Sequence, residues 1–260
     1  MGTPIDADGV RDLFKGAGIV FVGLVLELVV SFVAKLLIAR YLGPVSYGAV
    51  SIGLTLLTAL SLLVLVGLDS GVGRYLPRYD DPARRRGVLQ SALEIVLPLG
   101  VLTGAALFLA AGPVATAVFH DPSVARVIRV FSVAVPFTMV FRLAIGAVQG
   151  MQQSVPKVLV QNLALPLTRF CLVAVVLVAG LGAVGAAWAY GLAYVVAGVL
   201  GAYYLLRHTP LAADASPDPM HRELLVFSAP LMITAAMLQV LSNIDTFFLG
   251  YFASTTVVGV

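Results

Sequence analysis

The sequence predicts an all-α protein that crosses a membrane several times, as a polytopic bundle of transmembrane helices. Its 260 residues are 60% hydrophobic and only 11% charged, whereas an ordinary soluble domain carries about a quarter charged residues. The mean hydropathy is +1.02. A bilayer core about 30 Å thick needs roughly 20 apolar residues per helix, so a chain of this length has room for many spans. This composition excludes a soluble enzyme.

Seven apolar segments are each long enough to span a membrane, and breaks that are charged or rich in Gly and Pro separate them. The first segment contains Glu27 and Lys35 and lacks a small-residue cleavage site at its end. It is therefore predicted to remain as a helix and not to be a cleaved signal peptide. In chain order, the predicted spans lie near residues 17–39, 47–68, 88–111, 124–148, 158–180, 183–206 and 224–250.

Small residues predict close helix packing within two of these spans. The third span contains Gly100 and Gly104. In the sixth span, small residues recur at every fourth position and form a smooth stripe that lets another backbone approach. The stripe consists of Gly185, Ala189, Ala193, Ala197 and Gly201.

The distribution of Lys and Arg predicts the orientation in the membrane, because cytoplasmic loops carry the excess. Ten lie on one side of the predicted spans and three, Arg40, Arg126 and Arg129, lie on the other. We therefore expect a multi-pass protein of the cytoplasmic membrane with a cytoplasmic N-terminus. The arginines of the loop from Arg74 to Arg86 are the strongest determinant and can also contact anionic lipid headgroups. The ten are Arg11, Lys15, Arg74, Arg78, Arg84, Arg85, Arg86, Lys157, Arg207 and Arg222.

An internal repeat predicts the domain organisation. Residues 41–50, after the first span, resemble residues 251–260, after the seventh, at a shift of 210 residues. A repeat of six helices keeps the membrane orientation and is typical of two parallel lobes. The expected organisation is a six-helix lobe (1–206), a cytoplasmic inter-lobe loop (207–223) and the first helix of a second lobe (224–260), so that the chain is the N-terminal part of a longer protein.

Ionisable residues inside the predicted spans are the main functional signal, because they are costly at bilayer depth and face a cavity or a partner. Glu27 and Lys35 lie on one face of the first span. Asp245 occupies the position in the seventh span that corresponds to Lys35. Lys35 and Asp245 either meet across a central cleft and gate it, or extend separately to the interface while Glu27 pairs within its own lobe.

Arg169 is the deepest of these charges, eleven residues into the fifth span. It is predicted either to line a cavity, where its planar fork suits phosphate oxygens, or to form a structural ion pair with Glu94 or Glu27. Arg142 is expected at headgroup level. Asp69 and Arg74 are expected to form a cap and an interface anchor.

No catalytic or metal-binding pattern is evident in the sequence. It contains no P-loop, no HExxH and no GxSxG. Cys171 is the single cysteine and the three histidines are scattered over predicted loops. The chain is therefore predicted to be a protein without enzymatic activity, cofactor, metal site or nucleic-acid partner.

Four short motifs resemble a known family in order and spacing: Ala39-Arg-Tyr-Leu-Gly-Pro-Val-Ser-Tyr-Gly48, Gly67-Leu-Asp-Ser-Gly-Val-Gly-Arg-Tyr-Leu-Pro77, Arg142-Leu-Ala-Ile-Gly-Ala-Val-Gln-Gly150 and Asn243-Ile-Asp-Thr-Phe-Phe-Leu-Gly-Tyr-Phe252. They are similar to motifs of the oligosaccharide flippases, the polysaccharide biosynthesis group of the multidrug/oligosaccharidyl-lipid/polysaccharide (MOP) exporter superfamily. The resemblance covers nearly the whole chain. It implies a bundle like that of the multidrug and toxin extrusion (MATE) transporters, with a central cavity lined partly by the first and seventh helices.

The resemblance further implies a transporter that flips lipid-linked oligosaccharide across the membrane by alternating access. We expect Lys35 and Arg169 to contact phosphate, Glu27 and Asp245 to balance charge or gate the cavity, and the amides of Gln161, Asn162 and Asn243 to bind sugar. Expected partners are the lipid-linked oligosaccharide, membrane lipids and glycan-assembly enzymes. The alternatives are a cation-coupled multidrug exporter, a non-transporting scaffold of a glycan-synthesis complex, and a membrane glycosyltransferase or glycan polymerase.

Overall fold

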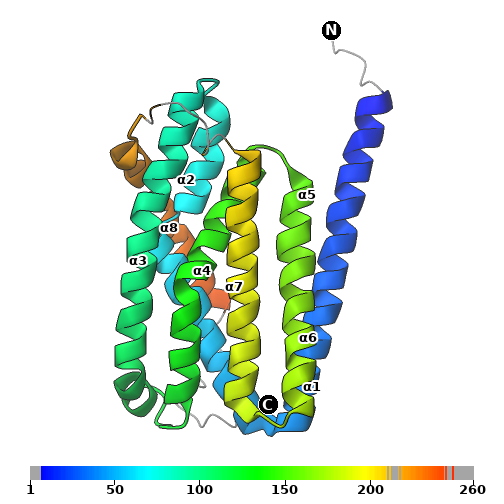
Figure 1. Ribbon diagram of the computed structural model, residues 1–260, viewed down its shortest axis with the longest axis vertical. Coiled ribbons are helices and arrows are strands. Elements are labelled where there is room, and N and C mark those ends of the chain that lie inside the picture. Colours follow the sequence, from blue (N-terminus) through cyan, green and yellow to red (C-terminus); the bar gives the residue numbers. More distant parts are fainter. Residues whose placement is uncertain are drawn as a thin grey trace.

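The computed structural model describes residues 7–209, 211, 216, 218–242, 244 and 248 (Figure 1). No strand occurs among the described residues, and the all-α prediction is confirmed. Five of the described helices are long and apolar enough to cross a membrane, and the first of these candidates is the 46-residue stretch Val20–Leu65. In chain order the elements are α1 (Ala7–Leu65), α2 (Leu68–Tyr75), the 3-10 helix η1 (Leu76–Arg78), α3 (Pro82–Ala117), α4 (Val124–Gly150), α5 (Ser154–Lys157), the π-helix η2 (Val158–Ala164), α6 (Leu165–Val178), α7 (Gly182–His208) and α8 (His221–Ser242).

Helix α1 is a hairpin of two arms, residues 7–42 and 44–65, which run in opposite directions (Figure 1). The reversal occurs at Gly43, with φ 80° and ψ 168°, and Pro44 follows directly. A positive φ of this kind is accessible to glycine at little cost, and proline cannot donate to the preceding turn. The first arm and the second arm contain the first and second predicted spans.

Helix α4 lies at the centre of the bundle and packs against α3, α7, the second arm of α1, and α2. In its most apolar stretch, 67% of the residues are buried. The small-residue stripe of α7 is buried, and Gly201 lies against Ala144 and Phe141 of α4. A Cβ at Gly198 would come within 2.7 Å of the Phe137 carbonyl oxygen. The end of the predicted stripe therefore lies at the contact between α7 and α4, whereas Gly185, at its start, lies against Leu181 and Val176.

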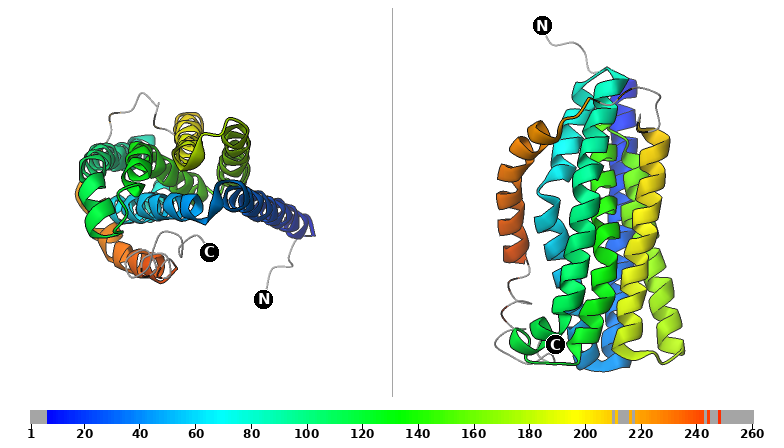
Figure 2. Two further views of the ribbon diagram at one scale, coloured as in Figure 1. Left: turned by 90° about the horizontal axis from the view of Figure 1, so that it is seen from below. Right: turned by 60° about the vertical axis from the view of Figure 1, so that its left-hand side comes forward.

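The first arm of α1 lies at the edge of the bundle (Figure 2). It contacts α6 and the π-helix η2, and the side chains of Phe21 and Phe32 are each 66% exposed. Exposed apolar side chains on a membrane-spanning helix face lipid, which is as apolar as they are. Among the side chains that are described for this arm, the buried ones are few, at Gly23, Ala34 and Ile38, so a narrow face carries its contacts with the lobe.

The start of α8 is fastened to α3. The backbone N–H of Met220 donates to Ser91 Oγ at 2.9 Å, and His221 Nε2 lies 2.7 Å from Glu94 Oε2. The backbone N–H of Asp218 donates to the Ala83 carbonyl at 3.4 Å. These contacts hold the N-terminal end of α8 at the end of the bundle that contains η1, the start of α3 and the end of α7 (Figure 1).

Candidate substrate pocket

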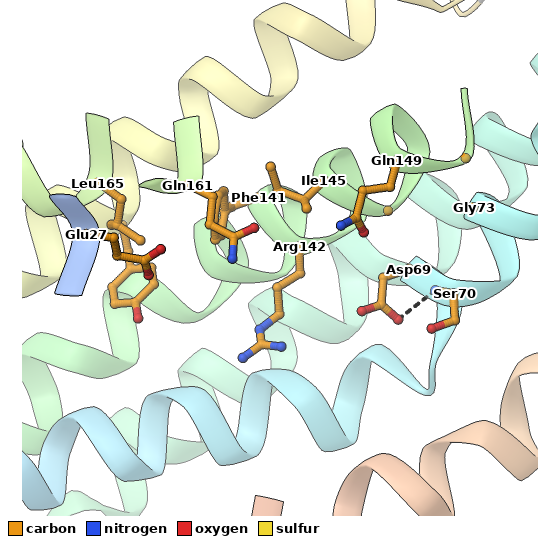
Figure 3. Close-up of a pocket in the computed structure, with 13 residues that line it drawn as sticks. Glu27, Asp69, Ser70, Gly73, Phe141, Arg142, Ile145, Gln149, Gln161 and Leu165 are labelled. Atoms are coloured by element: carbon orange, nitrogen blue, oxygen red, sulfur yellow. Dashed lines mark hydrogen bonds between the residues drawn. The ribbon is translucent and has the colours of Figure 1, made fainter. Parts of the chain in front are cut away.

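A polar pocket with a volume of 510 Å³, which we call the candidate substrate pocket, lies between the first arm of α1, α2, α4, η2 and α7. This volume is within the range of roughly 300–1,000 Å³ that is usual for small-molecule sites. Figure 3 shows charged and amide side chains from four of these elements directed into one space. The side chains that contribute polar or aromatic groups are Glu27, Asp69, Ser70, Phe141, Arg142, Gln149, Gln161 and Tyr194.

Glu27 and the neighbouring amides Gln161 and Asn162 are brought together, as their predicted roles require. The Asn162 amide Nδ2 donates a hydrogen bond to Glu27 Oε2. Glu27 and Gln161 both line the pocket. Asn162 is buried, and its Oδ1 atom has no hydrogen-bond partner among the described residues. The contact fixes the acid of the first arm of α1 against the π-helix.

The π-helix η2 has a local cause in the sequence. Pro166 has no N–H to donate to the carbonyl of Asn162, four residues earlier, and its ring would clash with that carbonyl in a regular α-helix. Widening the turn before the proline relieves the clash. Turns of this kind occur often at functional sites, and here the widened turn carries both amides. Gly23 lies opposite, where a Cβ would come within 2.7 Å of Val158 and 3.3 Å of Asn162.

Asp69 and Ser70 enter the pocket because α2 and α4 approach each other through glycines. A Cβ at Gly146 would lie 2.3 Å from the Asp69 carbonyl oxygen, and a Cβ at Gly150 would lie 2.3 Å from the Gly73 carbonyl oxygen. Such distances leave no room for a side chain at either α4 position. The Asp69 carboxylate accepts a hydrogen bond of 2.8 Å from the Ser70 backbone N–H, which the dashed line in Figure 3 marks.

Arg142 extends from α4 into the space between Glu27 and Asp69 (Figure 3). It is half-buried, and among the described residues its guanidinium forms no ion pair within 4 Å. A guanidinium presents five donors in a planar fork that matches a phosphate or carboxylate group. Arg142 is thus a permanent cation in the pocket whose donors are available to a ligand.

Arg169 lies beside the pocket and not in it. The residue is 8% exposed, and its guanidinium carbon lies 4.5 Å from the ring centroid of Tyr190 and 5.5 Å from that of Tyr194. Its Nε has no hydrogen-bond partner among the described residues, and no ion pair with Glu27 or Glu94 is formed there. Since Tyr194 lines the pocket, Arg169 reaches it only through this ring.

The remaining predicted site residues are not brought into the pocket. Lys35 is exposed on the first arm of α1 and does not line it. Asn243 and Asp245 lie outside the described residues, so the expected meeting of Lys35 and Asp245 stays a prediction. Within the described part of the chain, no three His, Cys, Asp or Glu side chains are grouped in a way that would hold a metal ion.

Sequence reasoning missed the pocket roles of Asp69, Arg142, Gln149 and Tyr194. Arg142 was expected at headgroup level and Asp69 as part of a cap, because both lie near the ends of predicted spans. The signal for the close approach of α2 and α4, which brings both residues to the pocket, was present in the glycines that follow each of them, since Gly73, Gly146 and Gly150 make the contact between the two helices.

Comparison with known proteins gives one family and one fold. A family model described as polysaccharide biosynthesis protein matches residues 13–260, whereas no curated protein matches the sequence significantly. An inward-facing multidrug resistance MATE family transporter of the MOP superfamily has a TM-score of 0.75 at 19% identity, covering 91% of this chain and 59% of that one.

Two further transporters have similar structures. The MATE multidrug transporter DinF-BH has a TM-score of 0.73 at 16% identity over 100% of this chain and 60% of that one. A MOP superfamily transporter from Pyrococcus furiosus, for which reverse polarity of the binding pocket suggests a different function, has a TM-score of 0.69 at 20% identity, covering 90% of this chain and 54% of that one. At these identities the likeness establishes the fold, and this chain spans less than two thirds of each transporter.

Proposed function

Because the chain belongs to the polysaccharide biosynthesis protein family and has the fold of MOP superfamily transporters, we propose that it flips lipid-linked oligosaccharide across the cytoplasmic membrane by alternating access. The observation that carries the proposal is Arg142, a cation without an ion pair among the described residues, in a pocket that also contains amides, a hydroxyl and aromatic rings. No covalent chemistry is required of the protein in this proposal.

Each kind of side chain in the pocket suits one part of such a substrate. The Arg142 fork binds phosphate oxygens. Gln149, Gln161 and Ser70 donate to and accept from sugar hydroxyls, and the rings of Phe141 and Tyr194 pack against the C–H faces of sugar rings. The polyprenyl tail needs no polar group and stays in lipid, so the pocket has to enclose only the head of the substrate.

The proposed conformational step uses the charges around Arg142. Glu27 and Asp69 lie on either side of the guanidinium (Figure 3). When a phosphate binds, it neutralises the guanidinium and weakens its attraction to both carboxylates. Because Glu27 lies on the first arm of α1 and Asp69 on α2, this change alters the attraction of two elements to α4. A ligand shifts a conformational equilibrium through such a difference in affinity.

Three further residues belong to the proposal. Arg169 sets the position of the Tyr194 ring, which it contacts, and its charge adds to the attraction for phosphate. Lys35 and Asp245 are proposed to approach each other in a different state of the transporter.

The N-terminus is proposed to be cytoplasmic, because the basic loop residues favour that side.

The test is a flipping assay in proteoliposomes that contain the protein produced from its native gene. Fluorescent lipid-linked oligosaccharide is added to one leaflet, and a membrane-impermeant glycosidase reports the fraction that reaches the other. Arg142→Gln is expected to lower the initial rate at least about tenfold, the loss that corresponds to roughly 1.4 kcal/mol. Arg126→Gln removes an exposed arginine of the same helix and is the matched control. If the unchanged protein flips the substrate no faster than protein-free liposomes do, the proposal is contradicted.

A second candidate is export of organic cations coupled to a cation gradient. It is favoured by the presence of two carboxylates, Glu27 and Asp69, and one guanidinium in the same pocket. This candidate predicts uptake of a cationic dye into the same proteoliposomes under a pH gradient, and loss of that uptake in Glu27→Gln. The oligosaccharide proposal predicts no dye uptake in either protein, so one preparation distinguishes the two candidates.

A further inference from the structure

A second cavity lies on the other side of α2, between η1, the start of α3, and α8. Its volume is about 900 Å³, and it shares no lining residue with the substrate pocket. Three arginines from three elements line it, Arg78 of η1, Arg84 of α3 and Arg222 of α8. We call it the arginine pocket.

The charge of the arginine pocket is only partly compensated. Glu223 is the single acidic residue among its lining residues. Arg84 forms an ion pair of 3.7 Å with Asp218, but both side chains are more than half exposed, and such pairs contribute little. Arg78 and Arg222 are exposed and form no ion pair within 4 Å among the described residues. The pocket therefore has two guanidinium groups free to bind an anion.

An aromatic and apolar wall completes the arginine pocket. Tyr75 lies edge to face with Phe227 at 5.5 Å and is stacked with Tyr79 at 6.4 Å. The guanidinium of Arg84 lies 5.4 Å from the Tyr79 ring centroid. Further along α8 from Arg222, the helix presents Val226, which is 68% exposed, and Leu231, which is 37% exposed. The cavity thus has a cationic rim and an apolar flank on one helix.

The requirements of membrane topology do not explain this arrangement. The positive-inside rule depends on how many basic residues flank the spans and not on where they lie relative to one another. Here the fold brings Arg222 to Arg78 and Arg84 from a distant part of the chain. The contacts of Asp218, Met220 and His221 with α3 hold it there. Figure 2 shows α8 running along α2 at this end of the bundle.

We infer that the arginine pocket is a binding site for the phosphate of a membrane lipid. Arginine forks bind phosphate oxygens in a bidentate manner, and basic pockets between transmembrane helices bind anionic headgroups. The exposed apolar side chains of α8 provide a surface for the start of the lipid chain, which a free phosphate would not need. This inference does not depend on which substrate the first pocket transports.

The test measures the affinity of the purified full-length protein for three probes, phosphatidylglycerol, polyprenyl phosphate and inorganic phosphate, by native mass spectrometry and by fluorescence titration of the labelled lipids. We expect at least one of the two lipids to bind and inorganic phosphate not to displace it. The variant Arg78→Gln/Arg222→Gln is expected to weaken lipid binding at least about tenfold, as loss of bidentate phosphate contacts should.

Two controls separate a site from general charge. Arg126→Gln/Arg129→Gln removes the same charge from exposed positions at the start of α4 and should leave lipid affinity unchanged. Val226→Asp places a charge on the exposed apolar flank without disturbing the core, and it should also weaken the binding of the lipid. The inference is overturned if both double variants lose lipid affinity equally, or if Arg78→Gln/Arg222→Gln loses none. It is also overturned if inorganic phosphate displaces the lipid at the same affinity, or if Val226→Asp keeps full lipid affinity. Unchanged melting temperatures verify that each variant is folded.

Discussion

Glu27 lies in the middle of an apolar helical arm, and its carboxylate accepts a hydrogen bond from the Asn162 amide. A carboxylate at this depth is costly unless a polar group or water satisfies it. The structure provides the polar group, because one carboxylate oxygen accepts from the amide, and the residue also borders the substrate pocket. Among the described residues, this contact ties the first arm of α1 to the π-helix through a polar group.

Breaking the contact between Glu27 and Asn162 should destabilise the protein. Asn162→Leu removes a hydrogen bond to a charged group, and we expect a loss of about 1–3 kcal/mol in the free energy of unfolding. Thermal or denaturant unfolding in detergent measures the loss. In a double-mutant cycle with Glu27→Gln, the two losses should not be additive. Additive losses would show that the two side chains do not stabilise each other.

Arg169 is a buried cation with an unpartnered Nε among the described residues, and it contacts two tyrosine rings. Cation–π contacts contribute about 0.5–2 kcal/mol each, whereas desolvation of an ion costs several kcal/mol. The cost outweighs the contacts, so Arg169→Met should raise the unfolding temperature while it lowers the flipping rate. Arg126→Met, at an exposed position, should change neither. A lower unfolding temperature for Arg169→Met, together with an unchanged flipping rate, would assign the arginine to stability alone.

The sequence predicts which residues are polar and deep, but not which of them share a cavity. Glu27, Gln161 and Asn162 were expected to act in one site and do lie together. Lys35 is on the same arm, two turns further along, and does not line the pocket. Helical spacing shows which residues share one face of their helix. It does not show which other element packs against that face, because this depends on the tertiary structure.

Among the elements, α2 and α4 show how glycine positions a site. The motifs Gly67–Pro77 and Arg142–Gly150 resemble a known family separately, and in the structure they pack on each other through Gly73, Gly146 and Gly150. Their contact places Asp69 opposite Arg142. The motifs are thus two halves of one packing interaction, and the polar residues within them line the substrate pocket.

Enlarging a residue at this contact should be costly. A Cβ at Gly146 would lie 2.3 Å from the backbone of Asp69, and backbone cannot move aside as a side chain end can. Gly146→Ala should destabilise the protein by about 1–3 kcal/mol through overpacking and reduce transport because Asp69 is displaced. Gly112→Ala in α3 meets nothing within 4 Å and should stabilise the helix by about 0.5–1 kcal/mol. Equal unfolding temperatures for the two variants would contradict this account.

Long helices follow directly from hydropathy, whereas the short elements do not. The 20-residue scale of a span identifies the apolar stretches within α3, α4 and α7. The eight-residue α2 and the π-helix η2 are too short for a hydropathy average to show. Both result from local chemistry, the positive φ of Gly67 and the missing N–H of Pro166, and both line the substrate pocket.

At the scale of the whole molecule, the proposed orientation predicts which side each turn can be reached from. In a Cys171→Ala background, Gln149→Cys in the substrate pocket should react with a membrane-impermeant maleimide from the cytoplasmic side of membrane vesicles. Leu181→Cys, in the exposed turn between α6 and α7, should react only from the opposite side. The reverse pattern would invert the proposed topology, and no reaction at position 149 would contradict a hydrated pocket.

The all-α bundle and its family were predictable from the sequence because hydropathy and motif order both extend over the whole chain. The family model covers residues 13–260, and the fold agrees with MOP superfamily transporters. The substrate was not predictable in the same way. It depends on a few polar groups from α1, α2, α4, η2 and α7, and the same fold is found in a multidrug resistance transporter and in DinF-BH.

The hydrogen bond between Glu27 and Asn162 joins residues that are 135 positions apart in the chain, and this separation has a consequence during biosynthesis. At a translation rate of about 5–20 residues per second, the acid of the first arm emerges roughly 7–27 seconds before its amide partner. Throughout that interval the nascent helix carries a carboxylate without its final partner into the bilayer. The ribosome-bound chain therefore depends on the insertion machinery, or on water held beside it, to shelter the first arm until the π-helix arrives.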